Sequence, residues 1–236
     1  MGKVKNPRLF TQEFQIDVEA FSKLGLLDPV LNADTRLFVD PVLLPSSKNS
    51  VIQAKGKAQF NKYFEDVIRL LQHSKTVGDV AWRNSARLLK LDEIPELCLG
   101  YGGNTTRGRD VAIDTQKRIL STAKEIIDLG IRDPELFSLV GLLEEGVGPD
   151  TIGDMTAHAI LPALVEITAQ AAKGLSIKVK DSHVGGTEAP LPQNKFSSKP
   201  VSLVPLDILR DLPVALDWSD VSTAAAARYA SLSTKS

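Results

Sequence analysis

Residues 150–173 read DTIGDMTAHAILPALVEITAQAAK, and this stretch decides the fold class. Apolar side chains recur along it at intervals of three and four residues: Ile152, Met155, Ala159, Ala163 and Ile167. That spacing predicts a helix with one buried face, continuing to about residue 173. Pro162 has no amide to donate to the His158 carbonyl, so we expect the helix to bend there.

The segments on either side also favour helices. Patterns of three- and four-residue spacing predict helices over residues 11–24, 60–71, 79–91, 111–129 and 135–143. Short runs rich in strand-forming residues predict one strand that ends at Asp40 and another over residues 97–101. The sequence therefore predicts a mainly α protein with a few short β-strands, an α+β fold.

The predicted helical domain occupies residues 1–180. Residues 181–200 contain Gly185, Gly186, Pro190 and Pro192 with almost no apolar period, so we expect a linker or mobile loop. Residues 201–236 form a short C-terminal segment or extension, with an alanine-rich stretch at 222–230 that favours a helix.

Composition narrows the class of protein. The chain has 236 residues and 43% hydrophobic content, enough for a substantial core. With a formal net charge of -1, the protein as a whole is not attracted to nucleic acid or membranes. Such contacts would require a local patch of basic residues. The single cysteine, Cys98, cannot form an internal disulfide, and no apolar run reaches the ~18 residues of a membrane span. We expect a cytoplasmic protein with no membrane partner.

An acidic stripe is the first candidate site. Asp150, Asp154 and His158 are four residues apart and share one side of the predicted helix, and Glu144 and Glu145 precede it. Carboxylates suit Mg²⁺ or Mn²⁺, so we predict a metal site formed by Asp150, Asp154 and Glu145. Asp154 and His158 are the predicted catalytic residues, with His158 as ligand or general base. The alternative is a solvated helix face, with Asp150 as the N-cap.

A glycine- and arginine-containing segment, residues 100–109, is the second candidate. Gly102 and Gly103 permit close backbone approach to a ligand, and Arg107 and Arg109 are suited to binding phosphate. The segment lacks the Gly-Lys-Ser/Thr ending of a P-loop and the spacing of a dinucleotide-binding motif, which disfavours both classes. A plain exposed loop remains the alternative interpretation.

Four short runs carry a resemblance to a known group of proteins. They are LFVDP (37–41), CLGYG (98–102), GPDTIGDMT (148–156) and LVPLDIL (203–209). Together they resemble uncharacterised bacterial proteins associated with mobile elements and antiphage defence. The resemblance implies a bacterial cytoplasmic protein with a role in defence, and it brings no established catalytic residues to these positions.

Three functions are compatible with these patterns. The leading hypothesis is a protein that acts on nucleic acid or a nucleotide by metal-assisted phosphodiester cleavage. The second is a non-enzymatic sensor, scaffold or regulatory subunit that binds a partner protein in a defence complex, and the third is a small-molecule enzyme with a pocket beneath the bent helix. The acidic stripe and the arginines must lie within about 10 Å of each other to share one phosphate ligand, which discriminates the first hypothesis from the second.

Overall fold

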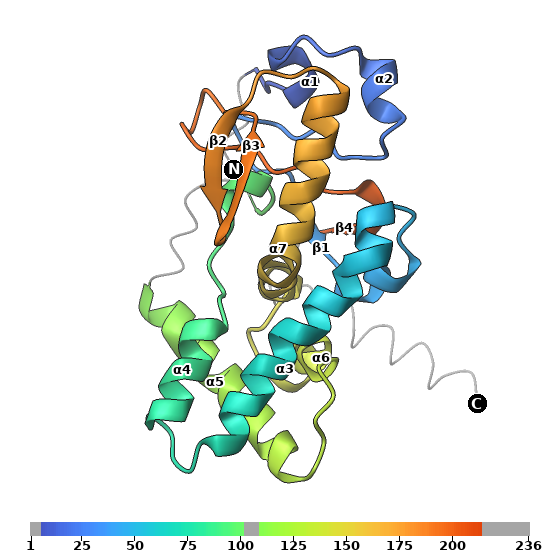
Figure 1. Ribbon diagram of the computed structural model, residues 1–236. Helices are drawn as coiled ribbons and strands as arrows, with labels where there is room; N and C mark the ends of the chain where they lie inside the picture. Colours follow the sequence, from blue (N-terminus) through green and yellow to red (C-terminus); the bar gives the residue numbers. More distant parts are fainter. Residues whose placement is uncertain (1–5, 102–108, 214–236) are drawn as a thin grey trace, which may run out of the picture.

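The structure, a computed structural model, describes residues 6–101 and 109–213 and is mainly helical with two small antiparallel sheets (Figure 1). The α-helices are α1 (Phe10–Glu13), α2 (Val18–Ser22), α3 (Lys57–His73), α4 (Val80–Leu88), α5 (Arg109–Asp128), α6 (Leu136–Leu143) and α7 (Pro149–Gly174). Three 3-10 helices, η1 (Pro41–Ser46), η3 (Pro95–Leu97) and η4 (Leu206–Ile208), and a π-helical turn, η2 (Ile52–Gly56), complete the helical elements. The predicted fold class is confirmed.

Each sheet is a single pair of strands. β1 (Leu37–Val39) pairs with β4 (Leu209–Asp211), so two segments far apart in the sequence meet, with Phe38 opposite Arg210. β2 (Lys180–Val184) and β3 (Thr187–Leu191) form a hairpin. Asp40 follows β1, and both of its carboxylate oxygens have a partner. One accepts a hydrogen bond from the Val42 amide at 2.9 Å, and the other forms an ion pair with Arg210 Nε at 2.6 Å.

Helix α7 lies at the centre of the fold. Most of its residues are buried, and it contacts α3, α6, β1 and β3. In Figure 1 its first part is seen nearly end-on while its second part runs lengthwise, so the helix bends as expected from Pro162. The Ala163 amide, next to that proline, donates to Gln59 Oε1 of α3 at 3.2 Å, which satisfies a donor at the bend.

Aromatic packing joins α3 to α6 in one continuous core. The ring of Phe64 stacks on Phe137 with centroids 4.5 Å apart, and Phe60 and Tyr63 pack against Phe64 from the same helix. The buried cluster extends from Phe10 to Ile208. Such offset ring pairs stabilise a core beyond the area they bury.

Residues 181–200 are not the expected linker. They contain most of the β2–β3 hairpin, in which Val184 and Leu191 are buried and β3 packs on α7. Gly185 and Gly186 both have positive φ, 55° and 85°, as a two-residue hairpin turn requires. Gly185 and Gly186 form the tight turn, and Pro190 lies in the strand β3. In its composition alone, this stretch resembles a linker.

The other boundaries also differ from expectation. Residues 97–101 form no strand, because Leu97 ends η3 and Leu99 makes only one parallel bridge, to Thr35. Val201, Leu203 and Val204 are buried, and the Leu203 amide donates to Thr168 Oγ1 of α7 at 2.7 Å. The described part of the C-terminal segment is thus built into the main core. None of the helices within 6–101 and 109–213 is both long and apolar enough to cross a membrane.

Candidate functional site

A cleft of about 450 Å³ opens where the first turns of α7 face the segment before η3 and the start of α5. Its lining residues are Leu91, Asp92, Glu93, Tyr101, Ala112, Thr115, Asp150 and Asp154. Four of these residues are acidic. The volume lies within the range of small-ligand sites, about 300–1,000 Å³, and fits a ligand of nucleotide size.

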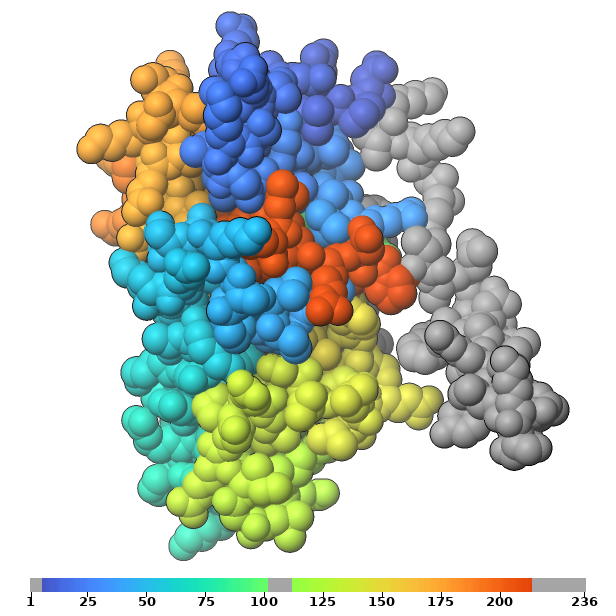
Figure 2. Space-filling view, turned by 90° about the vertical axis from the view of Figure 1, so that its right-hand side faces the viewer, coloured from blue at the N-terminus to red at the C-terminus, as the bar shows by residue number. Residues whose placement is uncertain are grey.

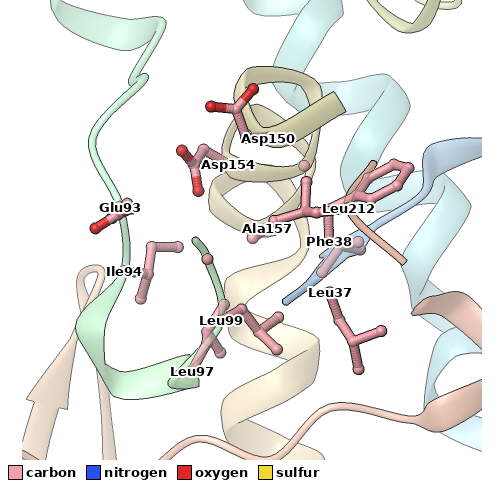
Figure 3. A pocket seen from close by; sticks show the side chains of 13 residues that line it. Leu37, Phe38, Glu93, Ile94, Leu97, Leu99, Asp150, Asp154, Ala157 and Leu212 are labelled. Carbon is pink, nitrogen blue, oxygen red and sulfur yellow. The ribbon is translucent and has the colours of Figure 1, made fainter. Parts of the chain in front are cut away.

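A narrow apolar slot continues from the cleft toward β1. It shares Glu93, Asp150 and Asp154 with the cleft and is otherwise lined mainly by apolar side chains, as Figure 3 shows. Its volume is about 20 Å³. That is room for roughly one water molecule, so the ligand-sized space is the cleft above it.

Gly153 explains why α7 lies so close to β1. A Cβ at this position would lie 2.8 Å from Phe38 Cβ and 3.3 Å from the Val39 amide nitrogen. Only a glycine permits this approach without a shift of the strand. Because Gly153 lies between Asp150 and Asp154, the same contact fixes the two carboxylates at the mouth of the slot.

Glu93 enters the cleft from the opposite wall. In Figure 3 it lies on the segment across the opening from the two aspartates, with its visible carboxylate oxygen on the side away from them. Gly100, with a φ of 137°, makes room for it, since a Cβ there would lie 3.1 Å from Glu93 Oε1. A side chain at residue 100 would therefore crowd this carboxylate as well as strain the backbone.

Asp150 and Asp154 do not lie on an open, solvated helix face. Both are half-buried in the cleft. Asp150 is also not the N-cap that the sequence suggested, because Gly148 holds that position and Pro149 begins the helix. It belongs to the first turn of α7, where the exposed amides of the helix favour a negative charge.

His158 lies outside the lining of the cleft. Its Nε2 is 2.8 Å from the Asp92 carbonyl oxygen, and since a carbonyl only accepts, Nε2 donates the hydrogen bond. The side chain is 9% exposed, and burial lowers the pKa of the imidazole below its ordinary value despite the nearby Asp92. Near neutral pH His158 is therefore an uncharged imidazole, and its hydrogen bond ties Asp92, the neighbour of Glu93 in the chain, to α7.

The lowered pKa of His158 predicts a specific pH dependence. Between the ordinary imidazole pKa of about 6.5 and the lower folded value, the unfolded chain binds a proton that the folded chain does not. The free energy of unfolding is therefore expected to fall as pH drops below about 6.5. Urea unfolding at about pH 7.5 and 5.5 measures this, and His158→Gln is expected to show a smaller fall. Equal falls in both proteins would contradict a buried neutral imidazole.

Glu145, predicted as a metal ligand, is exposed and outside the cleft. The neighbouring Glu144 accepts a hydrogen bond from the Thr122 hydroxyl. Asp92 and Glu93, which the sequence did not single out, occupy the cleft instead. Across the described ranges, no three Asp, Glu, His or Cys side chains are grouped so that they would hold a metal ion by themselves.

The predicted phosphate-binding residues lie mostly outside the described residues. This holds for Gly102, Gly103 and Arg107, and for the side chain of Arg109, whose backbone begins α5. The described residues on either side of this segment, Tyr101 and Ala112, both line the cleft together with Asp150 and Asp154.

Cys98 is not a nucleophile in this fold. It is buried, with a φ of 52° at the end of η3. Burial, together with the charges of Asp34 and Glu96, raises the pKa of its thiol to about 11. The thiol therefore stays protonated near neutral pH, and Cys98 behaves as the small buried apolar residue that its sequence context suggests.

The fold and the site define a mainly helical protein with an acidic cleft at the start of its central helix. The chain belongs to the family described as a domain of unknown function (DUF8370), whose sequence profile matches residues 15–217. The match contains all four carboxylates of the cleft. No curated protein and no solved structure matches the chain.

Proposed function

We propose that this protein binds a divalent cation in the acidic cleft and uses it to cleave a phosphodiester bond of a nucleic acid or nucleotide. The observation that carries the proposal is convergence: Asp150 and Asp154 share one cleft with Glu93 and with both described flanks of the glycine–arginine segment. In such a site carboxylates hold a cation, and the cation and arginines bind phosphate oxygens.

Mg²⁺ or Mn²⁺ fits the cleft better than Zn²⁺. Mg²⁺ is usually held by one or two carboxylates and completes its octahedron with waters and substrate phosphate. Asp150 and Asp154, one helical turn apart, supply that number. Zn²⁺ usually takes at least three protein ligands, and the described residues offer no such group.

In the proposed reaction, Glu93 accepts a proton from a water molecule as that water attacks phosphorus. A new phosphorus–oxygen bond forms, the bond to the leaving oxygen breaks, and that oxygen takes up a proton from solvent. Asp150 and Asp154 would hold the cation, which would supply positive charge beside the phosphate, and Arg107 and Arg109 would bind the outer phosphate oxygens. His158 contributes by positioning the segment that carries Glu93 and takes no direct part in the chemistry.

The size of the cleft limits the substrate. The cleft of about 450 Å³ has the size of a small-ligand site, so it takes a single nucleotide unit of the substrate. The resemblance to proteins of mobile elements and antiphage defence supports a role in bacterial defence, carried out in the cytoplasm. In that setting the substrate is a nucleic acid or a nucleotide.

The alternative is a non-enzymatic subunit that binds a partner protein. One observation favours it: the short helix α6 exposes Leu139, Leu142 and Leu143. Exposed apolar patches mark interaction surfaces. The two functions differ in whether the cleft binds a cation.

Thermal unfolding in the presence of Mg²⁺, Mn²⁺ or Zn²⁺ tests the proposal. A cation at about one hundred times its Kd stabilises the folded state by about 2.7 kcal/mol. We expect such stabilisation by Mg²⁺ or Mn²⁺ in the natural protein and its loss in the Asp150→Asn/Asp154→Asn variant. Glu145→Gln, which removes an acid outside the cleft, is the matched control and should retain it. Stabilisation that persists in the double variant would refute this metal site, and none in the natural protein would favour the subunit.

A further inference from the structure

Helix α6 is apolar on every side. Of its eight residues only Ser138 is polar. Leu136, Phe137 and Val140 are buried against the core, whereas the outer side chains Leu139, Leu142 and Leu143 are 52%, 83% and 53% exposed. A helix that is hydrophobic all round is normally buried all round.

We call Leu139, Leu142 and Leu143 the outer α6 face. Their spacing of three and four residues places them on one stripe of the helix. Leu129 and Ile131, in the connection that precedes α6, are exposed as well. A stripe of leucines at helical spacing is the surface against which an amphipathic helix packs.

The C-terminal part of the same chain contains an amphipathic sequence, with an apolar stripe that complements the leucines of the outer α6 face. Beyond the described residues, apolar side chains follow one another at intervals of three or four: Val214, Trp218, Val221, Ala225, Tyr229 and Leu232. At 100° per residue they fall within an arc of about 80°. The opposite side of the pattern carries Ser219, Asp220, Thr223 and Ser231 together with Leu216, Ala227 and Ala230. Most of this segment lies beyond the family match, which ends at residue 217.

The described chain ends beside the start of α7, the helix on which α6 packs. The Pro213 carbonyl accepts a hydrogen bond from Tyr101 at 3.4 Å, and Leu212 lines the slot beside Gly153 of α7. α6 packs on the same end of α7, through Gly141 against Ile152. Figure 2 shows residues up to 213, in red, on the same face of the molecule as the yellow region around α6.

Length is sufficient for this contact. Packed helices lie about 8–10 Å apart, so α6 lies about that far from α7, and a helix on the outer α6 face lies a further 8–10 Å or so away. Nineteen residues span about 28 Å as a helix, more than twice the length of α6. We infer that residues 214–232 dock as an amphipathic helix on the outer α6 face of the same chain. This inference is independent of the proposed metal site.

Tryptophan fluorescence tests the docking directly. The chain has two tryptophans, and Trp82 is buried in α4, so the difference between the natural protein and Trp218→Phe gives the emission of Trp218 alone. We expect this emission to be blue-shifted and poorly quenched by acrylamide. In Leu139→Glu/Leu142→Glu it should shift to the red, with quenching increased several-fold.

The control is Val18→Glu, which replaces an equally prominent exposed residue of α2 and should leave the emission of Trp218 unchanged. Val221→Glu, on the docking segment itself, should reproduce the effect of the α6 double variant. Solvent-like emission in the natural protein would overturn the inference. So would a blue shift that is lost on dilution as a dimer dissociates, since that result places the segment on a second copy.

Discussion

Replacement of Glu93 by glutamine is expected to lower phosphodiester hydrolysis by roughly 10²- to 10⁴-fold, the usual contribution of a general base. Glutamine keeps the shape of the side chain, but its amide does not accept the proton of the attacking water. The assay is hydrolysis of an activated diester such as bis(p-nitrophenyl) phosphate with Mg²⁺ or Mn²⁺. Stabilisation by the cation should survive, because Asp150 and Asp154 remain.

This pattern separates the role of Glu93 from that of the metal ligands. Asp150→Asn/Asp154→Asn should lose both hydrolysis and stabilisation by the cation. Glu145→Gln, a change to an exposed acid outside the cleft, should retain both. Hydrolysis at the natural rate in Glu93→Gln would remove this residue from the mechanism, and a natural protein that binds the cation without hydrolysis would reduce the cleft to a binding site.

The helical frame was predictable because its signal is local. The apolar spacing of residues 60–71 gives α3, and the stripe of residues 152–167 gives α7 together with its bend. The i, i+4 spacing of Asp150 and Asp154 likewise placed both on one side of the helix, where the structure has them. The helical spacing in the sequence therefore identified two of the four acidic residues of the cleft, Asp150 and Asp154.

The other half of the cleft depends on contacts between distant segments. Glu93 lies in an irregular stretch before Pro95, with no period to mark it, and reaches the cleft because His158 holds the Asp92 carbonyl. The role of His158 was obscured for the same reason, since its partner is 66 residues away in the sequence. Glu145 shows the converse: proximity in sequence suggested a ligand, and the turn before α7 directs it to solvent.

The misread linker has a similar cause. Gly185 and Gly186 are a recognised hairpin signal, but Pro190 and Pro192 nearby suggested an unstructured stretch. What stabilises the hairpin is its packing on α7, with Val184 and Leu191 buried. Composition reports neither of these contacts.

Replacement of Gly153 by alanine is expected to destabilise the protein, although alanine is the better helix former. Propensity alone would stabilise the helix by about 1 kcal/mol. The new methyl would lie 2.8 Å from Phe38 Cβ, an atom next to the backbone that moves only with the strand. Overpacking of this kind costs about 1–3 kcal/mol, so after the gain from helix propensity we expect a net loss of up to about 2 kcal/mol in urea unfolding.

Gly174→Ala is the matched control. It lies at the other end of the same helix, and a Cβ there would meet nothing within 4 Å. That variant should be neutral or more stable than the natural protein, so the two substitutions are expected to differ in sign. An unchanged or higher stability in Gly153→Ala would contradict the close approach of α7 to β1. Because β1 and Gly153 also line the slot below the carboxylates, weaker stabilisation by the cation in Gly153→Ala would link this contact to the cleft.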